Sequence, residues 1–146
     1  MKPSPTETEK RVLIIDVARD IATAAHNGQF RRDGVTPYIR HPEAVASRLS
    51  GESAYVQAAA WLHDVIEDTH FDAEVLYAHG IPQPVITAVE ILTKRDGVKY
   101  EDYLDGVKIC EIARKVKIAD MLCNLADSPT EKQTLKYAKG LSFLLA

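Results

Sequence analysis

The chain has 146 residues, of which 46% are hydrophobic and 27% are charged, and its formal net charge is −3 at pH 7. This length suits one domain of ordinary size, so we expect a single domain over residues 1–146. The balance of 18 Lys and Arg against 21 Asp and Glu argues against a disordered chain and against a dedicated nucleic-acid-binding protein.

Two further features of the sequence concern its location in the cell. No stretch is long and apolar enough for a membrane span, and the polar first ten residues are unlike a secretory signal. Cys110 and Cys123 form no CxxC pair and are typical of reduced thiols. We therefore expect a cytoplasmic protein that binds neither membranes nor nucleic acid.

Apolar residues recur with helical spacing along almost the whole chain, and strand-like alternation is not sustained anywhere. Thr6 and Glu9 predict a capping box at the start of a first helix, and Gly28 is a suitable stop for that helix. The pattern therefore predicts an all-α domain, a helical bundle of about seven or eight helices. A second helix is expected to begin at Pro42. The helices after it are expected to cover residues 54–68, 72–79, 82–93, 99–109, 111–126 and 131–145.

Two connections between these helices carry polar residues of interest. Residues 29–41 form an irregular segment, and because Pro42 suits the first turn of a helix, His41 is expected at or just before the N-cap. Lys94 and Arg95 lie in the turn before the helix expected over residues 99–109, and the pattern favours a solvated turn for both over a position near the rim of a cleft.

The helix predicted over residues 54–68 is apolar almost all round and ends in four ionisable residues. His63 and Glu67 are four residues apart, as are Asp64 and Asp68, so we expect each pair to share a face of this helix. Three carboxylates at the negative end of a helix dipole repel one another, which favours a bound cation. A solvated, fraying helix end is the alternative.

A single metal ion needs more ligands than His63 and Asp64 provide. His41 is held between an extended dipeptide and a proline, although taken alone it is typical of a surface N-cap residue. Asp120 has apolar neighbours in KIADMLCNL, so we expect an inward-facing carboxylate, with an ion pair to Lys117 as the alternative. Two histidines and two aspartates suit a divalent ion such as Mn²⁺ or Fe²⁺.

Three segments of the chain together resemble a known family. The first is AHNGQFRRDGVTPYIRHPEAVA (residues 25–46), the second is AAWLHDVIEDT (59–69) and the third is VKIADMLCNL (116–125). They resemble the H…HD…D signature of the HD-domain metal-dependent phosphohydrolases and, more closely, the hydrolase domain of the RelA/SpoT-homologue family. Since no residues are left for a synthetase domain, the chain resembles a stand-alone small alarmone hydrolase with an HD-domain helical bundle.

The resemblance implies a reaction and the residues for it. The family removes the 3′-pyrophosphate from the alarmone (p)ppGpp to give GDP or GTP and pyrophosphate, with one divalent metal, usually Mn²⁺. Glu67 and Asp68 match the pair that positions and deprotonates the attacking water. The implied metal ligands are His41, His63, Asp64 and Asp120.

The resemblance also implies contacts to a purine nucleotide. Arg31 matches a side chain that lies against the base, Arg32 one that helps to hold phosphate, and Asn124 one that contacts the sugar or a nearby phosphate. The family has Lys at the position of Arg32, and it often has Arg at the position of Ala126. His26 is expected to be a local hydrogen-bonding residue at a helix end.

These departures leave the substrate open between (p)ppGpp, its adenine analogue (p)pApp and another nucleotide phosphate such as NADPH. An HD-type nucleotide or NADPH phosphatase is the alternative within the same chemistry. An antitoxin or a nucleotide-binding regulator is the alternative from another class, and the presence of every implied ligand argues against it. The sequence leaves the oligomeric state open.

Overall fold

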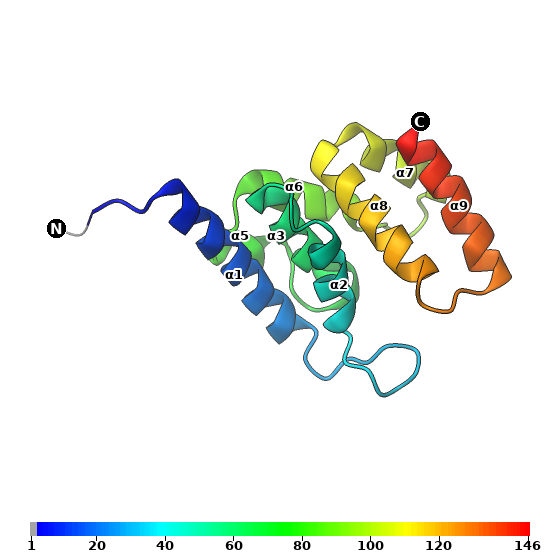
Figure 1. Cartoon of the computed structure of the whole chain (residues 1–146), viewed down its shortest axis with the longest axis horizontal. Coiled ribbons are helices and arrows are strands. Elements are labelled where there is room, and N and C mark those ends of the chain that lie inside the picture. The colour runs from blue at the N-terminus through cyan, green and yellow to red at the C-terminus, as the bar shows by residue number, and fades with distance from the viewer. Residues whose placement is uncertain (1–2) are drawn as a thin grey trace.

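The computed structural model describes residues 3–146, which contain nine helical segments and no strand (Figure 1). The expectation of an all-α bundle is confirmed, and the number of segments is higher because the helix predicted over residues 54–68 is divided in two. The segments are α1 (Glu7–Ala25), α2 (Arg40–Arg48), α3 (Ala54–Leu62), α4 (Val65–Asp68), α5 (Ala73–Ala78), α6 (Gln83–Leu92), α7 (Tyr100–Ile109), α8 (Glu111–Leu125) and α9 (Glu131–Leu145).

Helix α3 is the central element of the bundle. Its residues Ala58, Ala59 and Ala60 are completely buried, and their small side chains allow neighbouring helices to approach closely. Helices α1, α2, α6 and α8 all pack against α3. A residue at the C-terminal end of α3 therefore lies where several elements converge.

The first helix begins as predicted. The Thr6 side chain accepts a hydrogen bond from the Glu9 amide, and the Glu9 carboxylate accepts one from the Thr6 amide, which completes the capping box. The helix ends at Ala25, and Gly28 adopts a φ of +81° in the turn that follows. Glycine suits this left-handed conformation because it has no Cβ.

The predicted continuous helix over residues 54–68 is wrong at His63 and Asp64. Helix α3 ends at Leu62 and α4 begins at Val65. The imidazole Nδ1 of His63 lies 2.7 Å from the carbonyl oxygen of Ala60, which is the acceptor that the amide of residue 64 uses in an unbroken α-helix. A histidine side chain thus bonds to the carbonyl that a helical amide would use, at the point where α3 ends.

The segment between α1 and α2 is an ordered loop. Phe30 and Pro37 form an isolated antiparallel bridge, and the Asp33 carboxylate accepts hydrogen bonds from the amides of Val35 and Thr36. Helix α2 begins at Arg40 with Ile39 as its N-cap, so it begins two residues earlier than expected, and His41 lies inside its first turn instead of at or before the N-cap.

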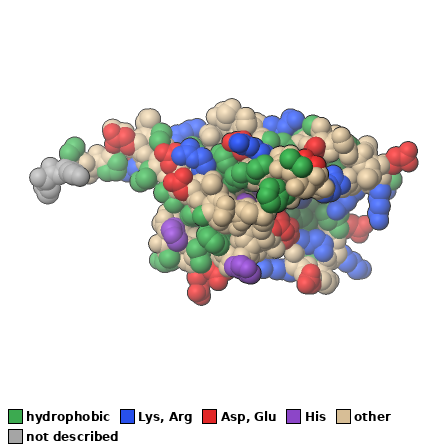
Figure 2. Space-filling model, turned by 90° about the horizontal axis from the view of Figure 1, so that it is seen from below, with side chains coloured by type: hydrophobic (Ala, Val, Ile, Leu, Met, Phe, Trp, Pro, Cys, Tyr) green, Lys and Arg blue, Asp and Glu red, His purple; other side chains and the backbone are tan. Residues whose placement is uncertain are grey.

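The other end of the molecule is formed by α7, α8 and α9. Helix α8 packs against α2, α3 and α6 on one side and against α7 and α9 on the other, whereas α9 packs mainly on α8 and α7. Basic side chains gather on the part of the lower face that lies under this end (Figure 2). Across residues 3–146, no helix combines the length and apolar character needed to cross a membrane.

Candidate active site

The structure brings four side chains from three places in the chain to one point. His41 comes from the first turn of α2, His63 and Asp64 from the junction of α3 and α4, and Asp120 from α8. The His41 Nε2 atom lies 2.8 Å from Asp120 Oδ1, and the His63 Nε2 atom lies 3.1 Å from Asp64 Oδ2 and 3.5 Å from Asp120 Oδ1. We call these four residues the metal centre, after the divalent ion that the resemblance in sequence implies for them.

The surroundings of the metal centre suit a divalent cation. His41, His63 and Asp120 are each at most 6% exposed, and one ligand atom from each lies within 4.8 Å of the others. Because His63 Nδ1 donates to the Ala60 carbonyl, the lone pair of Nε2 points at the two carboxylates. Nε2 is buried and makes no hydrogen bond within the described chain, so a cation between these donors would satisfy it.

The two aspartates of the metal centre are held as carboxylates. Burial by itself would raise the pKa of Asp64, but the facing imidazoles of His63 and His41 hold this pKa at about 2. Burial opposes the charge on Asp120 as well, and the Lys117 ammonium together with the two histidines keeps its pKa well below the usual value. Ionised oxygen donors are therefore available to a metal at neutral pH.

Three other polar side chains orient these ligands. The Tyr38 hydroxyl donates to Asp64 Oδ2 at 2.6 Å, the Lys117 ammonium lies 3.0 Å from Asp120 Oδ2, and the Asn124 amide donates to Asp120 Oδ1 at 3.3 Å. Asp120 thus has both arrangements that the sequence allowed, since it faces inward and also pairs with Lys117. Sequence reasoning missed Tyr38, because a tyrosine in a loop carries no pattern that marks a ligand partner.

His26 makes the local hydrogen bond that was expected and also packs against Tyr38. Its Nδ1 lies 2.8 Å from Gln29 Oε1, and its ring centroid lies 4.9 Å from that of Tyr38. The Gln29 amide in turn donates to the Asp68 carbonyl oxygen. Burial lowers the pKa of His26, so the imidazole that packs beside Tyr38 is uncharged at neutral pH.

Glu67 and Asp68 follow the metal centre on α4. Together with Asp64 they bring three carboxylates within 4.8 Å of one another. The Glu67 Oε1 atom accepts a hydrogen bond of 2.8 Å from the Lys94 amide, and burial raises the pKa of Glu67. Burial and the nearby Asp64 also raise the pKa of Asp68. Of the two residues expected in a solvated turn, Arg95 is exposed as expected, whereas Lys94 is partly buried beside Glu67.

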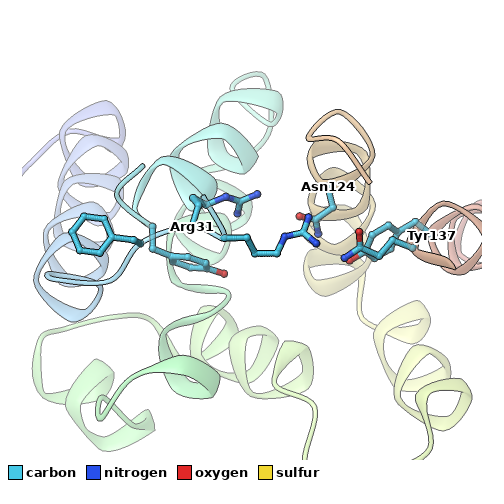
Figure 3. A pocket seen from close by; sticks show the side chains of 7 residues that line it. Arg31, Asn124 and Tyr137 are labelled. Carbon is cyan, nitrogen blue, oxygen red and sulfur yellow. The ribbon is translucent and has the colours of Figure 1, made fainter. Parts of the chain in front are cut away.

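A cleft of about 230 Å³ opens between the loop before α2 and the helices α8 and α9. Arg31 extends from the loop side toward Asn124 on α8 and Tyr137 on α9 (Figure 3). The Arg31 guanidinium pairs with the Asp127 carboxylate at 2.6 Å and lies 5.8 Å from the centre of the Tyr38 ring. We call this space the nucleotide cleft, after the ligand that the resemblance in sequence implies for it; its lining residues are Phe30, Arg31, Arg32, Tyr38, Asn124, Gln133 and Tyr137.

The sequence matches no family model but is similar to several named proteins. It is 36% identical to the guanosine-3′,5′-bis(diphosphate) 3′-pyrophosphohydrolase MESH1 of Xenopus tropicalis, over 79% of this chain and 69% of that protein. It is also 36% identical to the bifunctional (p)ppGpp synthase/hydrolase SpoT of Escherichia coli K12, over 82% of this chain and 17% of SpoT.

A third relative and a solved structure extend this similarity. A probable GTP pyrophosphokinase of Mycobacterium leprae is 34% identical over 90% of this chain, and the chain spans only 18% of that protein's length. A solved structure, described as a metazoan ortholog of SpoT that hydrolyses ppGpp, superposes with a TM-score of 0.76 and 25% identity. The superposition covers 99% of this chain and 88% of the other.

Proposed function

Because this chain belongs to the guanosine-3′,5′-bis(diphosphate) 3′-pyrophosphohydrolase family, we propose that it removes the 3′-pyrophosphate from the alarmone (p)ppGpp. Water attacks the phosphorus that is bonded to the ribose 3′-oxygen, and the products are GDP or GTP and pyrophosphate. The observation that carries the proposal is the convergence of two buried histidines and two aspartates beside a cleft with arginines on its wall.

Four side chains would hold the metal ion in this proposal. His41 and His63 offer imidazole nitrogens, and Asp64 and Asp120 offer carboxylate oxygens, a mixed set that suits Mn²⁺ among the common divalent ions. A bound cation lowers the pKa of water in its coordination sphere and offsets negative charge on phosphoryl oxygens. The free cysteines Cys110 and Cys123 fit the cytoplasmic location that we propose for the protein.

Glu67 and Asp68 are proposed to act on the attacking water. The Glu67 carboxylate is oriented by the Lys94 amide, and its raised pKa makes it a stronger base than an exposed glutamate. Asp68 lies one turn after Asp64, and its amide donates a hydrogen bond to the Asp64 carbonyl oxygen. The Asp68 carboxylate can accept a second hydrogen bond from the same water. Together they would hold the water and take its proton during the attack.

The nucleotide cleft is proposed to hold the purine nucleoside and its phosphates. Arg31 presents a planar guanidinium over the Tyr38 ring, a geometry that also suits stacking on a base. Arg32 and Asn124 supply donors for phosphate and ribose oxygens. Tyr137, which sequence reasoning missed, forms the opposite wall from α9 and can pack on the ribose or the base.

An assay of the products tests the proposal directly. The purified protein with added Mn²⁺ is incubated with ppGpp, and the products are separated by anion-exchange chromatography. We expect GDP and pyrophosphate in equal amounts, and no turnover when EDTA replaces Mn²⁺. Release of inorganic phosphate would instead identify a nucleotide phosphatase, and absence of turnover with both the guanine and the adenine alarmone would reject the proposal.

A further inference from the structure

A second pocket, of about 490 Å³, lies beside the metal centre, because one of its lining residues, Lys117, contacts Asp120. It is formed by the turn after α6 together with α7, α8 and α9, and Glu67 forms part of its wall. We call it the lysine pocket, because four of its seven lining residues are lysines. The lining residues are Glu67, Lys94, Tyr100, Tyr103, Lys117, Lys132 and Lys136.

Three of the four lysines of this pocket have no ion-pair partner in the part of the chain that the structure describes. Within residues 3–146, Lys94, Lys132 and Lys136 have no carboxylate within 4.0 Å, and Lys117 pairs only with Asp120. Burial lowers the pKa of Lys136, and repulsion from the other three ammonium groups lowers it further. Since the whole chain carries a net charge of −3, this concentration of lysines is not a consequence of general basicity.

Two tyrosines make the pocket more than a patch of surface lysines. The Lys136 ammonium lies 4.4 Å from the centre of the Tyr100 ring, and the Lys117 ammonium lies 5.5 Å from that of Tyr103. The two rings stack at 5.9 Å. The Tyr100 hydroxyl is buried and makes no hydrogen bond to the described chain, so a ligand oxygen is the partner that it lacks.

The lysine pocket and the nucleotide cleft meet at one carboxylate. Asn124 of the cleft and Lys117 of the lysine pocket both contact Asp120, and they are two turns apart on α8, about 10 Å. Tyr137 of the cleft also lies close to Lys136, whose ammonium is 5.9 Å from the centre of its ring. The two pockets are therefore neighbours, on the scale of one nucleotide with its phosphate groups.

We propose that the lysine pocket is a second phosphate-binding site, which takes a pyrophosphate or longer oligophosphate group of the nucleotide while the nucleoside lies in the cleft. The proposal rests on the proposed function and specifies the substrate further. The group bound is either the pyrophosphate that is removed from the 3′ position or the oligophosphate chain on the 5′ position. Both present the same chemistry to the lysines and to the Tyr100 hydroxyl.

The first test measures the binding of inorganic pyrophosphate without turnover. Isothermal titration calorimetry is carried out in EDTA on the wild-type chain, on the double variant Lys132→Gln/Lys136→Gln, and on the charge-matched control Lys10→Gln/Lys139→Gln, which replaces exposed lysines outside the pocket. We expect the control to bind like the wild type and the pocket variant at least about tenfold more weakly. Equal binding by both double variants, or no binding by the wild type, would overturn the proposal.

The second test separates the two sources of the phosphate group. The values of kcat/KM are compared for guanosine 3′-pyrophosphates with one, two or three phosphates at the 5′ position. If the pocket holds the 5′ chain, the defect of Lys132→Gln/Lys136→Gln grows with that chain. If it holds the 3′ group, the defect is the same for all three, and inhibition by product pyrophosphate weakens.

These outcomes distinguish this proposal from the proposed function. A wild-type chain that binds pyrophosphate through the pocket lysines but hydrolyses no alarmone would contradict only the proposed function. The opposite result has two parts: the wild-type chain hydrolyses ppGpp, and the pocket variant has the same kcat/KM and the same affinity for pyrophosphate as the wild type. This result would contradict only the proposed role of the lysine pocket.

Discussion

The metal centre and the nucleotide cleft share α8 but are held in different ways. His41, His63 and Asp120 are buried where α2, α3 and α8 pack together, and Tyr38 and Lys117 hold the carboxylates of the centre. The cleft is open, and its two walls are joined through the ion pair between Arg31 and Asp127, whose side chain is 58% exposed.

This difference indicates which part of the site tolerates change. A buried donor that moves loses its partners and cannot be compensated by water, so the metal centre is rigid and sensitive. A polar group at the exposed rim exchanges a protein partner for water at small free-energy change. We therefore expect the largest effects of substitution at or beside the metal centre and the smallest at the rim.

Replacing Glu67 with Gln is expected to have the largest effect on catalysis. The amide keeps the size of the side chain but cannot accept a proton, so kcat should fall by about 10²–10⁴-fold while metal binding is retained. Steady-state kinetics with ppGpp and metal titration measure the two quantities, with Glu74→Gln on α5 as the control. An unchanged kcat would remove Glu67 from the proton-accepting role.

Replacing Asp120 with Asn tests the sensitivity of the metal centre itself. The variant loses an ionised ligand that also faces Lys117, and the affinity for Mn²⁺ should fall by more than about 100-fold, beyond the loss typical of residues that only support ligands. Calorimetric titration with Mn²⁺ measures this, and circular dichroism checks that the helices persist. Asp105→Asn, at an exposed position on α7, is the control and should bind Mn²⁺ like the wild type.

Metal removal should change stability through the same residues. A cation that binds only the folded chain stabilises it by about 2.7 kcal/mol at a concentration 100 times its Kd, which corresponds to a rise of roughly 5–11 °C in Tm for a chain of this size. Thermal unfolding in EDTA and in Mn²⁺ measures the shift. The Asp120→Asn variant should show little of it, and an equal shift in that variant would place the ion elsewhere.

Replacing Tyr38 with Phe removes one hydrogen bond from the metal centre and preserves the ring. The Asp64 carboxylate then loses the hydroxyl that donates to it at 2.6 Å, and metal affinity should fall by about 10–100-fold. The same titration measures it, with Tyr77→Phe, an exposed tyrosine on α5, as the control. If Tyr38→Phe binds Mn²⁺ with the same affinity as the wild type, packing alone orients Asp64.

Replacing Asp127 with Asn should have the smallest effect. Arg31 loses its charged partner at an exposed position, so the free energy of unfolding should change by less than about 1 kcal/mol and KM for ppGpp by up to about fivefold, with kcat unchanged. Chemical denaturation and steady-state kinetics measure these values. A fall in kcat as large as that of Glu67→Gln would contradict the contrast between the rim and the metal centre.

Local patterns predicted the helices well because their signals lie close together in the sequence. The capping box of Thr6 and Glu9, and the ends of α5 to α9, are set by caps, prolines and apolar spacing within a few residues, and the structure has these elements within one or two residues of expectation. The break at His63 was missed because a histidine that bonds to a carbonyl of its own helix leaves the apolar spacing unchanged.

By itself, the sequence determined that the chain is helical, and the order of its three motifs indicated which histidines and aspartates to examine. Only the tertiary structure decided that those residues meet, that Tyr38 supports Asp64, and that lysines from the α6–α7 turn, α8 and α9 form one pocket. Helix formation depends on neighbours a few residues apart, whereas these contacts join residues tens of positions apart and exist only once α2, α3, α8 and α9 have packed.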